Sequence, residues 1–283
     1  MSRDEFLGLL RKAAKGAQRR SDVEALLAAH DLRLPAASEP ATTVYLSTVK
    51  QQRFEVEPDY LLDWRAHFEG DEQKRGHRVL DPTAWNERML PELRSLEEQL
   101  NTTSTTRLIR VRGLSRLSAW FAFGHTFSEV ARYTVEVDQQ GKLWRTDSPP
   151  SSLRVVEHGR DLFKAGDPSA IAVGISVTGS LEDDARAYLE ANLAARAVLF
   201  LRPDRELGRD CFGSAADVAA FARGAKERMR AFAKEHGAER LLLFYFGPLS
   251  GACFLGHQLN AIAREIQVME DQQPGYAPAF LLT

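Results

Sequence analysis

The sequence predicts an α/β protein of two similar subdomains, related by a pseudo-two-fold axis and preceded by a short helical leader. The first observation is a duplication. Residues 107–141 and 240–275 both open on Arg-Leu, pass through an apolar run and a Gly-His pair, and close on Asp-Gln-Gln before Gly or Pro-Gly. The second is that candidate strands and helices alternate along the chain. The third is that several strands are apolar along their whole length, which is typical of parallel sheets covered on both faces.

The repeat has a fixed spacing, because the paired glycines Gly124 and Gly256 lie 132 positions apart. A repeat of this length is too long for a solenoid and indicates two subdomains. We expect a helical leader and linker over residues 1–40, the first subdomain over residues 41–158 and the second over residues 159–283.

The leader has apolar residues at three- and four-residue spacing, and Ser21 with Glu24 fits a capping box. After a Pro/Ala/Ser linker, the first subdomain contains a β-branched strand, a helix with one apolar face, a strand, a helix that is apolar nearly all round, and a hairpin. These elements are expected over residues 42–49, 81–100, 107–113, 115–131 and 132–147.

The second subdomain repeats and extends this order, with Ser180 as a candidate helix cap and Gly237 as a candidate helix end. It contains strand, helix, strand, long helix, strand, helix and two final strands. These elements are expected over residues 169–179, 180–193, 196–203, 214–237, 240–247, 250–263, 265–271 and 277–282. Gly113 and Gly247 are expected at matching positions.

Composition excludes several classes of protein. The 283 residues carry a net charge of −2, so a broad basic face for duplex DNA is not expected. The apolar runs are too short to span a bilayer, and no signal segment opens the chain. The two cysteines, Cys211 and Cys253, are expected to be small buried residues in a reduced cytoplasm. No metal-binding motif is visible, so neither a metal nor a cofactor is expected.

Four short polar loops follow the candidate strands: Ser47–Gln51, Arg112–Arg116, Ser176–Ser180 and Gly247–Gly251. Ligands of open parallel sheets bind beyond the carboxyl ends of the strands. N–H groups at a helix start attract phosphate, and Lys50 with the two arginines could add positive charge. The loops of two facing halves would suit a ligand with repeated phosphates and approximate ring symmetry. The alternative is that they are ordinary turns.

The predicted ligand-binding residues come from these loops, with one tryptophan added. Trp64 and Trp144 each lie beside an arginine and could stack on a base, although packing in the core is the alternative for both. The set is Thr48, Lys50, Gln51, Trp64, Arg112, Arg116, Ser176, Thr178, Gly179, Gly247, Pro248, Ser250 and Gly251. No catalytic residue is assigned.

Other polar groups have simpler explanations. A Mg²⁺-dependent nuclease motif would be matched by Asp59 together with the run 72–74 (Glu-Gln-Lys). The charged composition around that run instead indicates a solvated loop. His67 and His77 lack the spacing of a nuclease or zinc site. His125 and His257 follow the repeated glycines, and their equivalence suggests a structural hydrogen bond to neighbouring backbone. Trp85 and Trp120 are expected in the core.

The C-terminal stretch resembles the signature of the SAVED domain. It consists of an apolar strand, Gly-Pro, small residues, a Leu-Gly helix, a polar strand and Tyr-x-Pro-x-Phe, and it spans residues 241–282. The segments "LLDWRAHFEG", "RLSAWFAFGHTF" and "LWRTD" resemble the first half of the same family. The resemblance covers about residues 42–283. It implies two fused CARF-like, Rossmann-like halves, in agreement with the repeat.

The resemblance also implies a function. SAVED domains sense cyclic oligonucleotides in anti-phage systems, namely CBASS and some type III CRISPR systems. The implied ligand is a cyclic tri- or tetranucleotide, such as cyclic oligoadenylate or a mixed cyclic trinucleotide. Binding commonly drives head-to-tail oligomerisation, which switches on an attached nuclease, NADase or protease effector.

About 40 residues precede the resemblance, fewer than these effectors need, so we expect the effector to be a separate chain. The protein is therefore expected to be a cytoplasmic, non-catalytic sensor that binds neither membranes nor duplex DNA. Two alternatives stay open. One is a ring nuclease that degrades the ligand, to which Lys50, Ser176 and Thr178 could contribute. The other is a plain protein-interaction module.

Overall fold

The computed structural model describes residues 40–49, 57–70, 77–139, 141–272 and 275–283. Contacts divide the chain into two units, Met1–Pro40 and Ala41–Thr283. The expected helical leader, like Lys50 and Gln51, lies outside the described residues. The fold below is that of the second unit.

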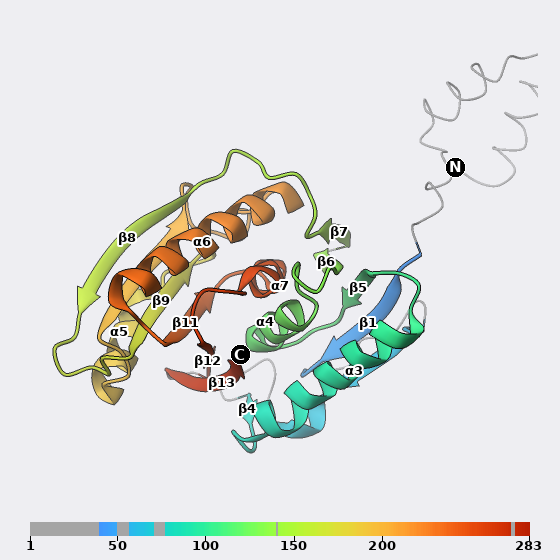
Figure 1. Cartoon of the computed structure of the whole chain (residues 1–283), viewed down its shortest axis with the longest axis horizontal. Coiled ribbons are helices and arrows are strands. Elements are labelled where there is room, and N and C mark those ends of the chain that lie inside the picture. The colour runs from blue at the N-terminus through green and yellow to red at the C-terminus, as the bar shows by residue number, and fades with distance from the viewer. Residues whose placement is uncertain (1–39, 50–56, 71–76, 140, 273–274) are drawn as a thin grey trace, which may run out of the picture. The chain divides into compact units, whose positions relative to one another are not determined.

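The first half is built on a five-stranded sheet (Figure 1). Its order is β2-β1-β5-β6-β7, and the first four strands are parallel. β7 returns antiparallel to β6 as the expected hairpin. The strands are β1 (Thr42–Ser47), β2 (Tyr60–Asp63), β5 (Leu108–Arg112), β6 (Thr134–Gln139) and β7 (Lys142–Arg145).

The second half is built on a six-stranded sheet of order β13-β12-β11-β9-β10-β8. The four central strands are parallel, and β13 and β8 are antiparallel edge strands. The strands are β8 (Val155–Leu162), β9 (Ala170–Ser176), β10 (Ala197–Pro203), β11 (Arg240–Phe246), β12 (Glu265–Asp271) and β13 (Tyr276–Leu282). A small separate pair joins β3 (Phe68–Glu69) to β4 (Arg78–Val79).

Helices connect the strands. They are η1 (Arg65–His67), η2 (Trp85–Met89), α3 (Leu90–Thr103), α4 (Leu117–Thr126), α5 (Glu182–Asn192), α6 (Ala215–His236) and α7 (Leu249–Gln258). The start of α6 is capped by Ser214, which accepts a hydrogen bond from the Asp217 N–H, and its end by Gly237 at φ +58°. Among the described residues, no helix is long and apolar enough to cross a membrane.

α4 and α7 pack against each other at the centre of the unit, between the two sheets (Figure 1). Glycine makes the close crossing possible. A Cβ added at Gly124 would lie 2.1 Å from the Cys253 carbonyl oxygen, and one added at Gly256 would lie 2.3 Å from the Phe121 carbonyl oxygen. Residues 121 and 253 are themselves 132 positions apart, so the crossing is symmetric. This symmetry confirms the predicted pseudo-two-fold relation and explains why the chain repeats its glycines.

The element boundaries follow the same repeat. Shifting α4 by 132 positions gives the bounds of α7. Gly113 and Gly247 are an exception to the expected match. Each directly follows its strand, but Gly113 lies four residues before α4 and Gly247 two residues before α7. The expectation of matching positions was therefore wrong, because β11 runs two residues further than β5 before its turn.

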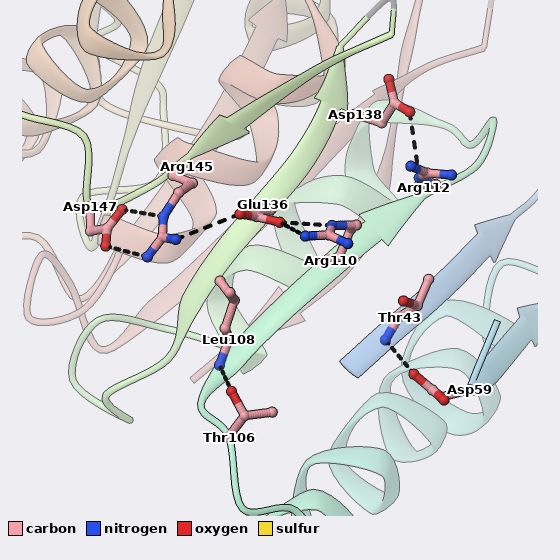
Figure 2. Close-up of polar contacts among 10 residues, drawn as sticks. All are labelled: Thr43, Asp59, Thr106, Leu108, Arg110, Arg112, Glu136, Asp138, Arg145 and Asp147. Atoms are coloured by element: carbon pink, nitrogen blue, oxygen red, sulfur yellow. Dashed lines mark hydrogen bonds and ion pairs between the residues drawn. The ribbon is translucent and has the colours of Figure 1, made fainter. Parts of the chain in front are cut away.

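The two sheets differ on their outer faces. The second sheet is apolar on both sides, and residues such as Leu242 and Phe244 pack beneath Leu189 of α5. On the first sheet, inward-facing residues such as Val111 and Val137 are buried, but Arg110 and Glu136 alternate with them on the opposite face (Figure 2). The prediction of apolar cover on both faces thus holds for the second sheet and was wrong for the first.

Candidate functional site

Two loops stand at equivalent places, at the carboxyl ends of the parallel strands. In the first half, the N–H groups of Thr48 and Val49 both donate to the Leu114 carbonyl at 3.3 Å. In the second half, the N–H groups of Val177 and Thr178 both donate to the Phe246 carbonyl, at 2.8 and 3.2 Å. Positions 114 and 246 are again 132 apart, so the repeat extends into the loops.

Leu114 and Phe246 are also alike in exposure, each at 43%. Phe246 lies against Gly179, where an added Cβ would meet the ring at 2.6 Å. The absence of a Cβ at Gly179 therefore lets the ring approach the neighbouring loop closely while part of the ring faces solvent. An exposed ring held in this way can stack on a nucleobase. Neither residue was assigned to the site from the sequence, because Phe246 ends an apolar strand and Leu114 is the one apolar residue of its loop, and both patterns are typical of core residues.

The start of α4 is bound to the second half of the unit. Arg116, which precedes the helix, forms an ion pair with Glu270 of β12 at 2.7 Å and also donates to the Asp271 carbonyl. The Ser118 hydroxyl and N–H donate to the same Glu270 carboxylate, at 2.5 and 3.2 Å. Glu270 is 5% exposed, and burial raises its pKa, while Arg116 and Ser118 oppose that rise.

The start of α7 has different surroundings. Ser250 is fully buried, and its hydroxyl has no hydrogen-bond partner among the described residues. Tyr245 lies beneath the turn and donates to the Pro248 carbonyl at 3.0 Å. Added Cβ atoms at Gly247 and Gly251 would lie 2.4 and 2.0 Å from the Tyr245 hydroxyl, so both glycines are required for this packing. Its ring contacts Phe121 of α4 edge-on at 5.3 Å between centroids.

The structure brings many of the predicted residues together in two groups. Thr48 lies beside Arg116, whose N–H donates to its hydroxyl at 2.8 Å. In the second half, the loop that begins at Ser176 meets the turn before α7, and the Leu181 N–H donates to the Ser176 hydroxyl at 3.3 Å. This second group comprises Ser176, Thr178, Gly179, Gly247, Pro248, Ser250 and Gly251.

Of the residues predicted to supply positive charge, the two arginines are described, and both already have acidic partners. Arg116 is paired with Glu270, and Arg112 lies 3.5 Å from Asp138 on the outer face of the first sheet (Figure 2). Arg112 therefore points away from the α4–α7 side of its sheet. At the start of α7, by contrast, the donors are neutral: the N–H groups of the helix and the Ser250 hydroxyl.

Trp64 is 1% exposed, as the packing alternative expects. Its ring N–H donates to Glu92 of α3 at 2.7 Å, and the ring packs near Phe280. In this position the ring is covered by protein, so it offers no face to a base. Trp85 and Trp120 are fully buried, as predicted.

The repeated histidines have structural surroundings. The His257 ring Nε2–H donates to the Tyr133 carbonyl at 2.9 Å, which is the predicted bond to neighbouring backbone. Burial lowers the pKa of His257 and of His125. Both cysteines are buried and unlinked, as expected, and burial raises the pKa of each thiol.

The remaining candidates are only partly described. Asp59 accepts the Thr43 N–H at 2.7 Å (Figure 2), and the run 72–74 lies outside the described residues. A surface pocket of about 730 Å³ lies at the end of β10, lined by Val156 and by residues 202–207. It contains none of the predicted residues, and its Arg205 is held by Asp217 at 2.9 Å.

Comparison with solved structures shows the fold. The chain is similar to the SAVED/CARF-domain containing receptor Cap4 of Acinetobacter baumannii, solved with the cyclic trinucleotides 2′3′3′-cAAA and 3′3′3′-cAAA, at 21% identity and a TM-score of 0.68. It is also similar to the Cap4 receptor of Moraxella osloensis, at 18% identity and a TM-score of 0.64. These matches cover 86% of this chain and 50 to 51% of the receptors, so the chain spans about half their length.

No curated protein matches the chain. The family model of SAVED, the SMODS-associated and fused to various effectors sensor domain, matches residues 92–282, about two thirds of the sequence. The matched region includes the α4–α7 crossing, both exposed apolar side chains and both helix starts. The chain belongs to the SAVED family.

Proposed function

We propose that this protein is a sensor of a cyclic oligonucleotide, a cyclic tri- or tetranucleotide that contains adenine, and that it has no catalytic activity of its own. The observation that carries the proposal is the equivalence of two loops, each with a half-exposed apolar side chain, Leu114 or Phe246, next to a helix start. A cyclic oligonucleotide has the same alternation of flat apolar bases and phosphates, arranged around a ring.

Two further findings support the ligand class. The chain belongs to a family described as a sensor domain, and the Cap4 receptors of the same fold were solved with cyclic trinucleotides of adenine. At this site, the apolar side chains would contact bases. The N–H groups that begin α7 would face a phosphate, because they have no partner within the helix and lie at the positive end of its dipole.

The output of the sensor is the second part of the proposal. The family is described as fused to various effectors, so the bound state is expected to control an effector protein. Because the two halves are similar but not identical, the first half of one molecule can dock on the second half of the next. Such heterologous contacts extend into open assemblies unless the rotation closes a ring. Light scattering at saturating ligand should therefore show an increase in mass.

Chromatography of the ligand tests the proposal against its alternatives. The protein is incubated with cyclic triadenylate or cyclic tetraadenylate, separated from free nucleotide, denatured, and the nucleotide is analysed. A sensor returns the intact ring from the protein fraction. A linear product would identify a ring nuclease, and absence of nucleotide from the protein fraction with both rings would leave the interaction module as the explanation.

A further inference from the structure

The starts of α4 and α7 are equivalent in sequence and in backbone. Ser118 and Ser250 are the second residues of their helices and lie 132 positions apart. Each helix start leaves N–H groups without partners inside the helix, and the second-residue serine can add a hydroxyl donor. The two starts would therefore attract the same kind of group, an anion.

At α4 this anion is part of the chain itself. The Ser118 hydroxyl and N–H converge on the carboxylate of Glu270, and Arg116 completes its contacts at 2.7 Å. Glu270 thus occupies the place where a phosphate would bind at a helix start. A second anion is disfavoured there, because it would lie next to a buried carboxylate.

At α7 the corresponding residue is neutral. In the first sheet Ile109 pairs with Val135, and in the second sheet Leu241 pairs with Ile266. Ile109 and Leu241 are equivalent in the repeat, so their partners Val135 and Ile266 are equivalent in strand register. The residues four positions after these partners, Gln139 on β6 and Glu270 on β12, therefore correspond to each other. α7 contacts β6 as α4 contacts β12, so Gln139 takes the place of the carboxylate in the first half.

Two buried polar atoms support a ligand at this place. The Ser250 hydroxyl and the Gln139 side-chain oxygen are both buried, and neither has a hydrogen-bond partner in the described part of the chain. A buried polar group without a partner costs free energy, so such groups call for an explanation. The residues just before Ser250, Gly247–Leu249, are partly exposed, so the helix start reaches the surface.

We propose that the start of α7, with Ser250 and Gln139, is the anion subsite of this protein, and that Glu270 closes the equivalent subsite at α4. The proposal deepens the proposed function and rests on it only for the identity of the ligand. The donors are the helix N–H groups and the Ser250 hydroxyl, which suit a phosphate diester, and the neutral Gln139 adds no negative charge that would repel it. One phosphate of the ring is then held by the second half, and the ring is bound asymmetrically.

Inorganic phosphate is the direct probe, followed by NMR of the backbone amides in the whole protein. We expect saturable shifts at the Ser250 and Gly251 amides and none at the Ser118 and Ala119 amides. Glu270→Gln should create a response at Ser118, because the charge is removed while Arg116 remains. Absence of a saturable shift at Ser250 would overturn the proposal, as would equal responses at both helix starts in the unmodified protein.

Matched variants separate this proposal from the proposed function. Ser250→Ala should weaken phosphate binding about tenfold, since it removes one hydrogen bond to a charged group, and Ser118→Ala should leave the phosphate response of α7 unchanged. Calorimetry with 3′3′3′-cAAA follows. If the ring binds Ser250→Ala as it binds the unmodified protein, the subsite is wrong and the sensor function stands. If phosphate binds at α7 and the ring does not bind, the subsite stands and the ligand class is wrong.

Discussion

Ser118 and Ser250 are the same residue at the same place in two helices, and they differ in what faces them. Ser118 donates to a buried carboxylate, whereas the Ser250 hydroxyl has no partner among the described residues. A hydrogen bond to a charged group contributes about 1.5–3 kcal/mol, and an unpaired buried hydroxyl contributes nothing favourable. The contribution of each serine to stability is therefore decided by its surroundings.

This contrast predicts opposite results for one substitution. Ser118→Ala should lower the free energy of unfolding by about 1.5–3 kcal/mol, and Ser250→Ala should leave it within about 0.5 kcal/mol of the unmodified protein or raise it. Urea denaturation at neutral pH, without ligand, measures both. Equal losses in the two variants would show that Ser250 has a partner in the native state.

The central element is the crossing of α4 over α7, which holds the two halves together. Each helix presents a glycine to a backbone carbonyl of the other, at distances that leave no room for a Cβ atom. The two helices can come this close because neither glycine has a Cβ atom. The same crossing carries the two helix starts and therefore fixes the spacing of the site.

Gly124→Ala and Gly256→Ala should each destabilise the protein by about 1–3 kcal/mol, because the helices must move apart. This loss is expected although alanine favours a helix by about 0.5–1 kcal/mol over glycine. Gly208→Ala is the control, since an added Cβ there meets nothing within 4 Å. If thermal denaturation gives both helix variants the stability of the control, the crossing is not as tight as described.

The repeated histidines make this element sensitive to acid. Burial lowers the folded-state pKa of His257 below its ordinary value of 6.5, so the unfolded chain takes up a proton first as pH falls. The associated stability is present above about pH 6.5 and is lost as pH falls through 6.5 toward the folded pKa. Glu270 acts in the opposite sense, because burial raises its pKa and its ionisation costs stability as pH rises.

Comparing His257→Gln with the unmodified protein isolates the histidine from Glu270. The glutamine amide can still donate to the Tyr133 carbonyl but cannot gain a proton. Melting temperatures measured between pH 5 and pH 8 should fall less steeply toward acid in the variant. Parallel curves for the two proteins would assign the acid sensitivity to other groups.

The elements that the sequence predicts well are those with apolar periodicity or duplication. Both central helices and most of the parallel strands fall where expected, but β2 was not predicted. β8 was missed because Glu157, His158, Arg160 and Asp161 give it no apolar alternation, as suits a charged edge strand. The charged outer face of the first sheet, with Arg110, was also missed, because the strand pattern alone does not say whether a helix covers it.

At the site, the sequence predicted the loops but not their chemistry. Arg112 and Arg116 read as free cations, but their partners, Asp138 and Glu270, are far away in the sequence. The pairing of β5 with β6 brings Arg112 to Asp138, and the packing of α4 on β12 brings Arg116 to Glu270. Leu114 and Phe246 are identified as a pair by the structure, because the carbonyl of each accepts hydrogen bonds from two consecutive N–H groups of the neighbouring loop.

For the whole molecule, the central claim is that one cyclic ligand spans both halves. The claim requires the two exposed apolar side chains to contribute to the same binding event. Substituting the apolar side chain of either half should then weaken binding, although both halves keep their fold. The claim is independent of whether the bound state assembles further.

Calorimetry with 3′3′3′-cAAA tests this most directly, using the unmodified protein, Leu114→Ala, Phe246→Ala and the control Leu143→Ala. Leu143 is 42% exposed on β7, outside the site. We expect one ring per chain, and a loss of binding free energy of about 1–3 kcal/mol for Phe246→Ala, in line with base stacking on an aromatic ring. Leu114→Ala should also bind more weakly, and the control should bind normally. Unchanged affinity in both site variants, or no binding by the unmodified protein, would contradict the claim.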